Sequence, residues 1–293
     1  MAIIRRTGLF LLINFLVITM LSIILGLLGL KMDDVSFIVG FCALIGFGGS
    51  FFSLWISKAI AKSRYKVKLI DPNTASPREL FIYNVVHRMA EENGIRMPEV
   101  GVFKAPSPNA FATGPTKNKA LIAFSNSILS SLSEDELAAV AGHEMSHILQ
   151  GDMVTMSLIM GVVNTFVLAL ARILAMVLDS ALRDNKGRGG LGYFGYRAVV
   201  YLLQNVLFLL ANIPIAAYSR FREYRADAGA AKMVSPQAMI AALRAIDVSA
   251  PAATQRVAEA DMAMIHNKRK VSIYSTHPSI EDRVRALERM LIR

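Results

Sequence analysis

His143-Glu144-Met145-Ser146-His147 places two imidazoles and a carboxylate at the spacing that a catalytic zinc ion requires. Residues four apart lie one above the other on a helix, so the ring nitrogens of His143 and His147 point toward one position. Glu144 lies to the side of that position, where it can act on a water molecule. The stretch predicts a helix that binds one Zn²⁺ ion per chain, as in zinc hydrolases; the alternative is two surface histidines on one helical turn.

The composition indicates a membrane protein. Of the 293 residues, 54% are hydrophobic and 18% are charged, and the mean hydropathy is +0.44, unlike an ordinary soluble chain. Four apolar stretches account for the excess: residues 8–30, 35–56, 153–178 and 198–217. Each is near the length of about 20 residues that crosses a bilayer, so we expect four hydrophobic helices.

The first apolar stretch is longer than the core of a secretory signal peptide, and no small-x-small cleavage site follows it. We therefore expect a retained membrane anchor. The one cysteine, Cys42, lies inside the second apolar stretch, so the sequence offers no disulfide framework.

The excess positive charge gathers next to a predicted membrane span. The net charge is +10 and the pI is about 9.8. The residues directly after the second apolar stretch include Lys58, Lys62, Arg64, Lys66 and Lys68. This positive-inside pattern favours anionic lipid headgroups over nucleic acid as the partner, and it predicts that the N-terminus and residues 58–152 lie in the cytoplasm.

Short strands are expected at residues 99–104, 109–113 and 119–125, the last two joined as a hairpin. In zinc proteases such a strand can pair with the extended backbone of a substrate. The candidate residues for this contact are Asn109, Ala110, Phe111 and Ala112. The alternative is a hairpin that only supports the helix with the two histidines.

Two capping boxes predict where helices begin. One pairs Ser76 with Glu79, and the other pairs Ser133 with Glu136. The second helix is expected to end at Gly151. The histidine motif therefore falls in the middle of a helix.

Glu223 is the predicted third metal ligand. The third apolar stretch begins just after His147, and Glu223 follows just after the fourth, so two membrane crossings return the chain to its starting side. Zinc hydrolases need three protein ligands. Asp227 lies one helical turn after Glu223 and is expected to accept the free N–H of a zinc-bound histidine. The alternative for this pair is a solvated acidic face.

His277 precedes a predicted C-terminal amphipathic helix. It could approach the site and stabilise an oxyanion, or it could be a capping or packing histidine. The sequence leaves both open.

These motifs together resemble the HtpX-type membrane zinc metalloproteases, which are related to the CAAX prenyl proteases. The resemblance covers essentially the whole chain, and its specific part is the pairing of residues 143–147 with residues 223–227. It implies a metalloendopeptidase of the bacterial cell inner membrane that faces the cytoplasm. It also implies removal of misfolded or damaged membrane proteins, as protein quality control in a stress response.

We therefore expect a mainly α membrane protein with four hydrophobic helices and a cytoplasmic α+β, zincin-like metalloprotease domain that contains a small β-sheet. The expected parts are two transmembrane helices (1–57), a first catalytic part with the zinc-binding helix (58–152), a hydrophobic helix pair with its loop (153–217) and a second catalytic part with the third ligand (218–293). The expected partners are polypeptide substrates, chiefly membrane proteins, and the lipid bilayer. The sequence indicates no oligomeric state.

The predicted reaction is peptide-bond hydrolysis, in which Glu144 takes a proton from the attacking water and delivers it to the leaving amine. One alternative is an intramembrane zinc protease, but the helix over residues 133–150 is too polar to lie exposed in lipid. Another is a non-catalytic membrane adaptor or holdase, which a zinc analysis would distinguish.

Overall fold

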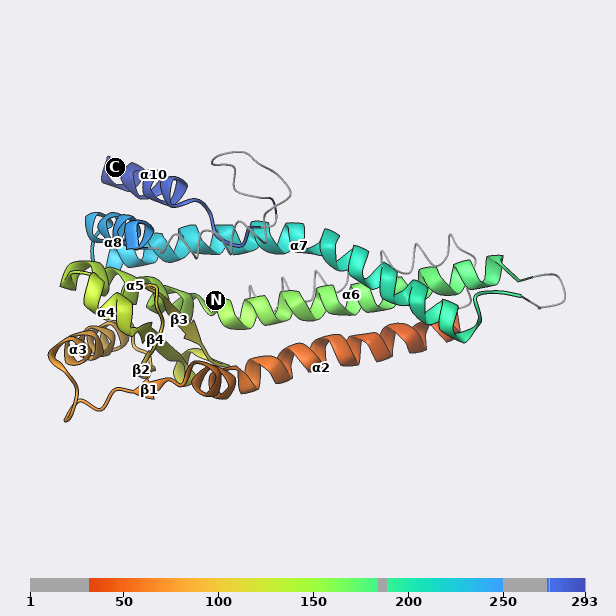
Figure 1. The fold of residues 1–293 in the computed structure, drawn as a ribbon, viewed down its shortest axis with the longest axis horizontal. Helices are drawn as coiled ribbons and strands as arrows, with labels where there is room; N and C mark the ends of the chain where they lie inside the picture. Colours follow the sequence, from red (N-terminus) through yellow and green to blue (C-terminus); the bar gives the residue numbers. More distant parts are fainter. Residues whose placement is uncertain (1–31, 184–188, 250–272, 274, 293) are drawn as a thin grey trace. The chain divides into compact units, whose positions relative to one another are not determined.

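The computed structural model describes residues 32–183, 189–249, 273 and 275–292. The first predicted span, residues 8–30, lies outside the described residues. The described chain is mainly helical with one small β-sheet, which confirms the predicted fold class (Figure 1).

The secondary structure follows the chain in this order. The helices are α2 (Met32–Tyr65), α3 (Pro77–Glu92), α4 (Asn126–Ser131), α5 (Glu134–Gln150), α6 (Asp152–Ala181), α7 (Gly192–Met233), α8 (Pro236–Ser249) and α10 (Ile280–Leu291). The strands are β1 (Lys68–Leu69), β2 (Glu99–Phe103), β3 (Ala110–Thr113) and β4 (Leu121–Ser125).

Three helices of the described residues are long and apolar enough to cross a membrane, and they contain the second, third and fourth of the four predicted apolar stretches. They are α2 from Ser36 onward, α6 and α7. α7 also continues to Met233, well past the predicted end of the fourth stretch at residue 217. The reason is that its polar second half keeps an apolar face at helical spacing, with Ala226 and Ala230 buried.

The chain divides into two compact units. Unit 1 contains residues 1–53 and 155–215, and unit 2 contains residues 54–154 and 216–293. Every residue of the predicted zinc site belongs to unit 2. The predicted domain boundaries at residues 57, 152 and 217 stay predictions.

In unit 1, α2 and α6 approach each other closely at two glycines. A Cβ atom on Gly46 would lie 2.4 Å from Thr165 Oγ1, and one on Gly161 would lie 2.8 Å from the ring of Phe47. Small residues at helix contacts of this kind are typical of membrane bundles, where close backbone approach supplies much of the stabilising contact.

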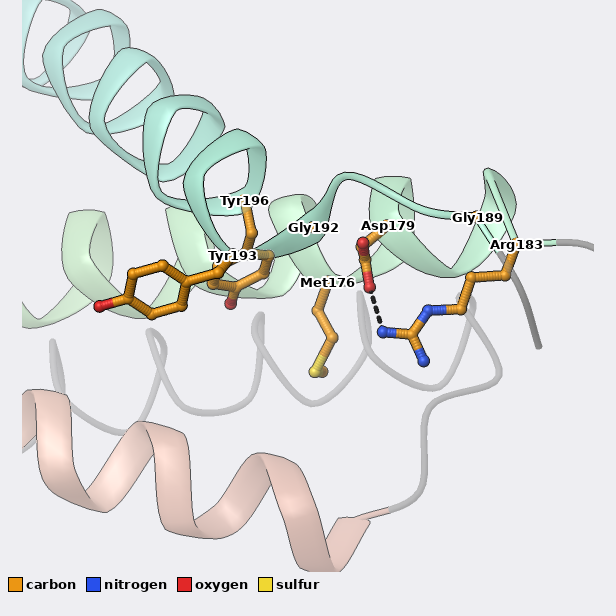
Figure 2. Close-up of a pocket in the computed structure, with 7 residues that line it drawn as sticks. All are labelled: Met176, Asp179, Arg183, Gly189, Gly192, Tyr193 and Tyr196. Atoms are coloured by element: carbon orange, nitrogen blue, oxygen red, sulfur yellow. Dashed lines mark hydrogen bonds and ion pairs between the residues drawn. The ribbon is translucent and has the colours of Figure 1, made fainter.

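The turn between α6 and α7 is held by Asp179. One carboxylate oxygen of Asp179 accepts a hydrogen bond from the backbone N–H of Leu191 at 2.7 Å, and the other accepts from Arg183 at 2.6 Å. Figure 2 shows the cavity beside this turn, which is lined by Met176, Asp179, Arg183, Gly189, Gly192, Tyr193 and Tyr196.

The four strands of unit 2 form one mixed sheet in the order β1-β2-β4-β3. β2 and β4 are parallel, and β3 is antiparallel to β4. The three predicted strands are therefore present, and so is the predicted hairpin. β3 lies at one edge of the sheet, so one side of its backbone has no strand partner within the described part of the chain.

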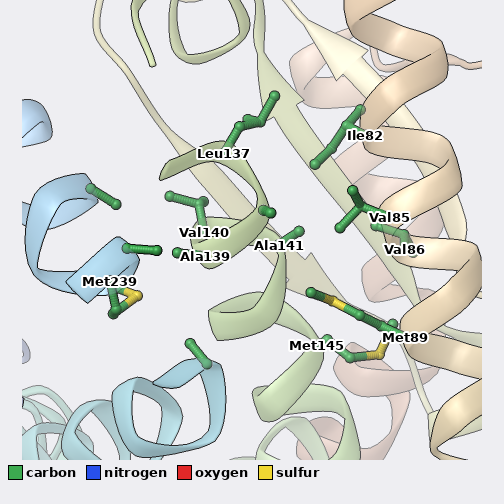
Figure 3. Packing of buried hydrophobic residues seen from close by; sticks show 14 of the residues in the cluster. Ile82, Val85, Val86, Met89, Leu137, Ala139, Val140, Ala141, Met145 and Met239 are labelled. Carbon is green, nitrogen blue, oxygen red and sulfur yellow. The ribbon is translucent and has the colours of Figure 1, made fainter. Parts of the chain in front are cut away.

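Helix α5 lies at the centre of the hydrophobic core of unit 2. It contacts α3, α8 and β3. Figure 3 shows Leu137 and Met145 of α5 packed with buried side chains of α3 and α8. Both residues are fully buried. The core therefore fixes the helix that carries the histidine motif.

Both ends of α5 are specified by local sequence. The predicted capping box is present, with Ser133 accepting from the backbone of Glu136 and Glu136 accepting from the backbone of Ser133. The helix ends at Gly151, whose φ of 64° is the left-handed conformation that favours glycine. A second capping box, between Ser76 and Glu79, starts α3 as predicted.

Replacing Gly46 by Leu is expected to destabilise the folded protein by about 1–3 kcal/mol, because the side chain would overlap Thr165. Thermal unfolding of the full chain in detergent measures the effect. Gly49→Leu is the matched control, since a Cβ atom at that position meets no atom of the described residues within 4 Å. Equal unfolding temperatures for the two variants would contradict this packing.

Candidate metal centre

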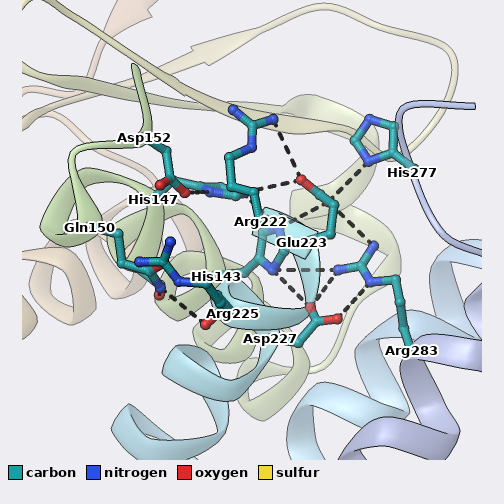
Figure 4. A network of polar contacts seen from close by, with 11 residues as sticks. His143, His147, Gln150, Asp152, Arg222, Glu223, Arg225, Asp227, His277 and Arg283 are labelled. Atoms are coloured by element: carbon teal, nitrogen blue, oxygen red, sulfur yellow. Dashed lines mark hydrogen bonds and ion pairs between the residues drawn. The ribbon is translucent and has the colours of Figure 1, made fainter. Parts of the chain in front are cut away.

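Two helices bring the three predicted ligands together. His143 and His147 come from α5, and Glu223 comes from α7. The two Nε2 atoms are 3.2 Å apart, and they lie 3.6 and 3.5 Å from the two carboxylate oxygens of Glu223. All three side chains are buried, and their candidate ligand atoms lie within 4.8 Å of one another (Figure 4).

These separations fit one small metal ion. Zinc bonds to nitrogen and oxygen ligands are about 2.0–2.2 Å long, so tetrahedral ligand atoms around zinc lie roughly 3.4 Å apart. Two imidazoles and one carboxylate are also a donor set found in catalytic zinc sites, which keep a fourth position open. The residues present therefore fit the group that the sequence predicts.

Each of the two histidines contacts a carboxylate through its Nδ1 atom. Asp227 Oδ1 lies 2.9 Å from His143 Nδ1, and Asp152 Oδ2 lies 2.8 Å from His147 Nδ1. A carboxylate in this position fixes the tautomer and leaves Nε2 free for a metal. Asp227 is the residue that the sequence predicted for this contact.

Asp152 was not predicted. The sequence does contain a signal for it: Asp152 is an acidic residue that directly follows Gly151, where α5 ends, and it begins the next helix. The left-handed turn at Gly151 brings the Asp152 carboxylate back to His147, five residues earlier. Asp152 is almost fully buried, with 1% of its surface exposed.

Arg283 was also not predicted, and it completes the polar network. It comes from α10, and its Nε donates to Asp227 Oδ2 at 2.7 Å while an Nη donates to Oδ1. This two-point contact is a strong one, and it holds the carboxylate that faces His143. No local pattern pairs residues this far apart in sequence.

The surroundings of His143 favour the charged form of its imidazole. Burial disfavours a charged ring, but hydrogen bonds with Asp227 and Glu223 outweigh burial and raise the pKa of His143 to about 9. Metal binding to this histidine near neutral pH therefore displaces a proton.

The structure brings His277 and Glu144 to the same region. His277 Nδ1 lies 3.0 Å from Glu223 Oε2, and 64% of the His277 side chain is exposed. Glu144 is buried on α5 and interacts electrostatically with Arg283. His277 therefore contacts the third clustered residue, and Glu144 lies on the same helix as the two histidines.

The close approach of α5 and α7 depends on a glycine. A Cβ atom on Gly229 would lie 2.0 Å from Ser146 Oγ, so a larger residue there would push the two helices apart. Gln150 bridges the same contact by donating to Ser146 Oγ and to the carbonyl of Arg225.

Alternate residues of β3 face in different directions. Ala110 and Ala112 pack against the core that contains α5, whereas the ring of Phe111 lies 5.2 Å from that of Tyr65 and 5.4 Å from that of Phe103. Asn109 precedes the strand, and its backbone N–H donates to Ser125 Oγ. Since β3 is an edge strand in contact with α5, it lies next to the helix with the two histidines.

Comparison with known proteins agrees with this geometry. The family model described as Peptidase family M48 matches residues 78–291. Protease HtpX from Shewanella halifaxensis (strain HAW-EB4) is 40% identical over 287 residues, which cover 97% of this chain and 99% of the relative. The chain belongs to peptidase family M48. Protease HtpX from Stenotrophomonas maltophilia (strain K279a) is 42% identical over 283 residues, covering 96% of this M48 peptidase and 97% of the relative.

A solved structure shares the fold. Ste24p from S. mikatae superposes with a TM-score of 0.58 at 20% sequence identity and covers 97% of this chain. The M48 peptidase spans 64% of the length of that chain. Membership of the family confirms the prediction of a metalloprotease, and the apolar helices and bacterial relatives make it a bacterial membrane protein.

Replacing Asp152 by Asn is expected to lower the zinc affinity of this M48 peptidase about 10–100-fold, because a neutral amide orients His147 less strongly. Competition with a chromophoric chelator measures the affinity on the full chain in detergent. Asp135→Asn is the control, since Asp135 is exposed on α5. A zinc affinity equal to that of the wild type would show that Asp152 has no such effect.

Proposed function

We propose that this M48 peptidase is a zinc-dependent endopeptidase of the bacterial inner membrane that cuts misfolded or damaged membrane proteins on the cytoplasmic side. The observation that carries the proposal is the buried cluster of His143, His147 and Glu223 with Glu144 on the same helix as the histidines. Its biological role would be protein quality control under stress.

His143, His147 and Glu223 would hold the zinc ion. When bound, zinc supplies a Lewis acid that polarises a peptide carbonyl and lowers the pKa of water. Asp227 and Asp152 keep the two imidazoles in the tautomer that presents Nε2. Their contribution is to preorganise the site, since buried side chains held by hydrogen bonds need no rearrangement.

Glu144 would take the proton from the attacking water and deliver it to the leaving amine. The Glu144 carboxylate is buried and interacts electrostatically with Arg283. His277 would donate to the developing oxyanion, and support comes from its exposed ring next to Glu223.

The edge of β3 would bind the substrate backbone as an added strand. The four residues of this contact would be Asn109, Ala110, Phe111 and Ala112. Support comes from the edge position of β3, which has no further strand partner among the described residues, and from its contact with α5. Main-chain pairing of this kind suits substrates of varied sequence.

A cytoplasmic orientation is supported by charge. Lys58 and Lys62 form ion pairs with Glu99 within unit 2, whereas Arg64, Lys66 and Lys68 are exposed directly after α2 or at its end. Exposed basic residues next to a span favour the cytoplasmic surface and anionic lipid. The alternative of an intramembrane protease is disfavoured because α5 is not one of the candidate spans.

Replacing Glu144 by Gln is expected to lower the rate of cleavage about 10²–10⁴-fold, because the amide cannot accept a proton. Zinc should stay bound, since Glu144 is not one of the three clustered ligands. Glu223→Gln is the matched variant, and it should lose zinc as well as activity. Zinc content and cleavage of a membrane-protein substrate are measured on each purified protein.

Wild-type cleavage by Glu144→Gln protein would contradict the assigned role. A wild-type protein that purifies without near-stoichiometric zinc would instead favour the non-catalytic adaptor or holdase.

A membrane-tethered substrate is expected to be cut at least about tenfold faster than the same unfolded segment without its anchor, because a shared membrane raises the effective concentration. The comparison uses proteoliposomes that contain the full chain. A segment displayed on the opposite face of the membrane is the control and should stay intact. Equal rates for tethered and free segments would argue against a preference for membrane proteins.

A further inference from the structure

Four arginines lie near the cluster on α7 and α10, and three of them have clear partners. Arg283 is fully engaged with Asp227. Arg220 donates to the backbone carbonyls of residues 273 and 275. Arg225 lies over the ring of Phe221, 5.8 Å from its centroid. These contacts explain why the three side chains lie where they do.

Arg222 has no comparable set of contacts. Its Nη2 lies 3.6 Å from Glu223 Oε1, which is longer than a hydrogen bond. Its Nε is buried without a hydrogen-bond partner among the described residues. A buried unpaired donor is costly, so the present position of this guanidinium is weakly held and can give way to a better acceptor. Since 22% of the side chain is exposed, such an acceptor can come from outside the chain.

Arg222 and His277 approach different oxygens of the same ligand. Arg222 lies closest to Glu223 Oε1, the oxygen that also faces His147. His277 and Arg283 lie on the side of Oε2. Figure 4 shows Arg222 and Arg283 on opposite sides of the Glu223 carboxylate. Hydrogen-bond donors therefore lie on both sides of Glu223, Arg222 on one side and His277 on the other. The proposed function puts the scissile bond next to this carboxylate.

We propose that Arg222 binds the substrate by donating hydrogen bonds to a backbone carbonyl oxygen next to the scissile bond. This inference rests on the proposed peptidase function of the cluster. A guanidinium presents several N–H donors in one plane, and every peptide unit offers a carbonyl acceptor. A backbone contact also serves substrates of many sequences, as main-chain pairing with β3 would.

The test uses the full chain in detergent with Glu144→Gln as the background, so that substrate binds without being cut. Fluorescein-labelled casein is the probe, and its Kd is measured by fluorescence anisotropy. Adding Arg222→Gln is expected to raise the Kd about tenfold, and Arg222→Lys should raise it less, because the lysine keeps the charge. In the Glu144 wild type, Arg222→Gln should raise KM about as much and change kcat little.

Arg225→Gln is the matched control, because it removes the same charge from the same helix one turn away. Its Kd for casein should equal that of the background protein. Zinc affinity, measured with a chelator, should be the same for Arg222→Gln and Arg225→Gln.

Three results would overturn the proposal. The first is an unchanged casein Kd in Arg222→Gln. The second is a parallel loss of zinc affinity, which would mean that Arg222 only supports Glu223. The third is a loss of binding affinity for acidic peptides alone. A pair of labelled peptides that differ only by Glu-to-Gln replacement tests the last outcome. Failure of the peptidase function itself would appear separately, as a wild-type protein without zinc or cleavage.

Discussion

The contact between α5 and α7 is the constraint on which the site depends. It places the imidazoles of His143 and His147 against carboxylates of α7 in a buried site. Buried ionisable groups are unfavourable unless each is paired. The structure meets this requirement for both histidines and for Asp227 with short contacts to oppositely charged or hydrogen-bonding groups. The glycine at position 229 lets the two helices approach closely. The rest of unit 2 holds this contact in place.

Two features of α5 connect this contact to the chain on either side. Its buried apolar residues fix it among α3, α8 and the sheet, so the histidines cannot turn away from α7. Because α5 ends at Gly151, α6 begins directly after it at Asp152, and the Asp152 carboxylate contacts His147 Nδ1. The residue that orients one ligand is therefore also the first residue of a candidate membrane span.

Much of this site could be predicted because its signals are local. The spacing of His143 and His147, the capping box and Gly151 each act within a few residues, and Glu223 followed from counting apolar stretches. Arg283 could not be predicted, because its contact with Asp227 depends on how α10 packs against α8 and α7. The length of α7 was underestimated because hydropathy reports the apolar segment and not the amphipathic helix that continues from it.

Charge balance explains why these side chains suit a metal cation. Four carboxylates, those of Glu144, Asp152, Glu223 and Asp227, lie at or next to the cluster. The guanidiniums that contact Glu223 and Asp227 are those of Arg222 and Arg283. The carboxylates therefore outnumber the guanidiniums that contact them. Burial lowers the pKa of His143, but its hydrogen bonds with Asp227 and Glu223 outweigh burial and raise that pKa, so these carboxylates favour a positive charge on the imidazole. A metal cation would supply positive charge at the position where both Nε2 atoms and Glu223 converge. The orienting carboxylates would therefore favour a cation at this position as well as fixing the imidazoles.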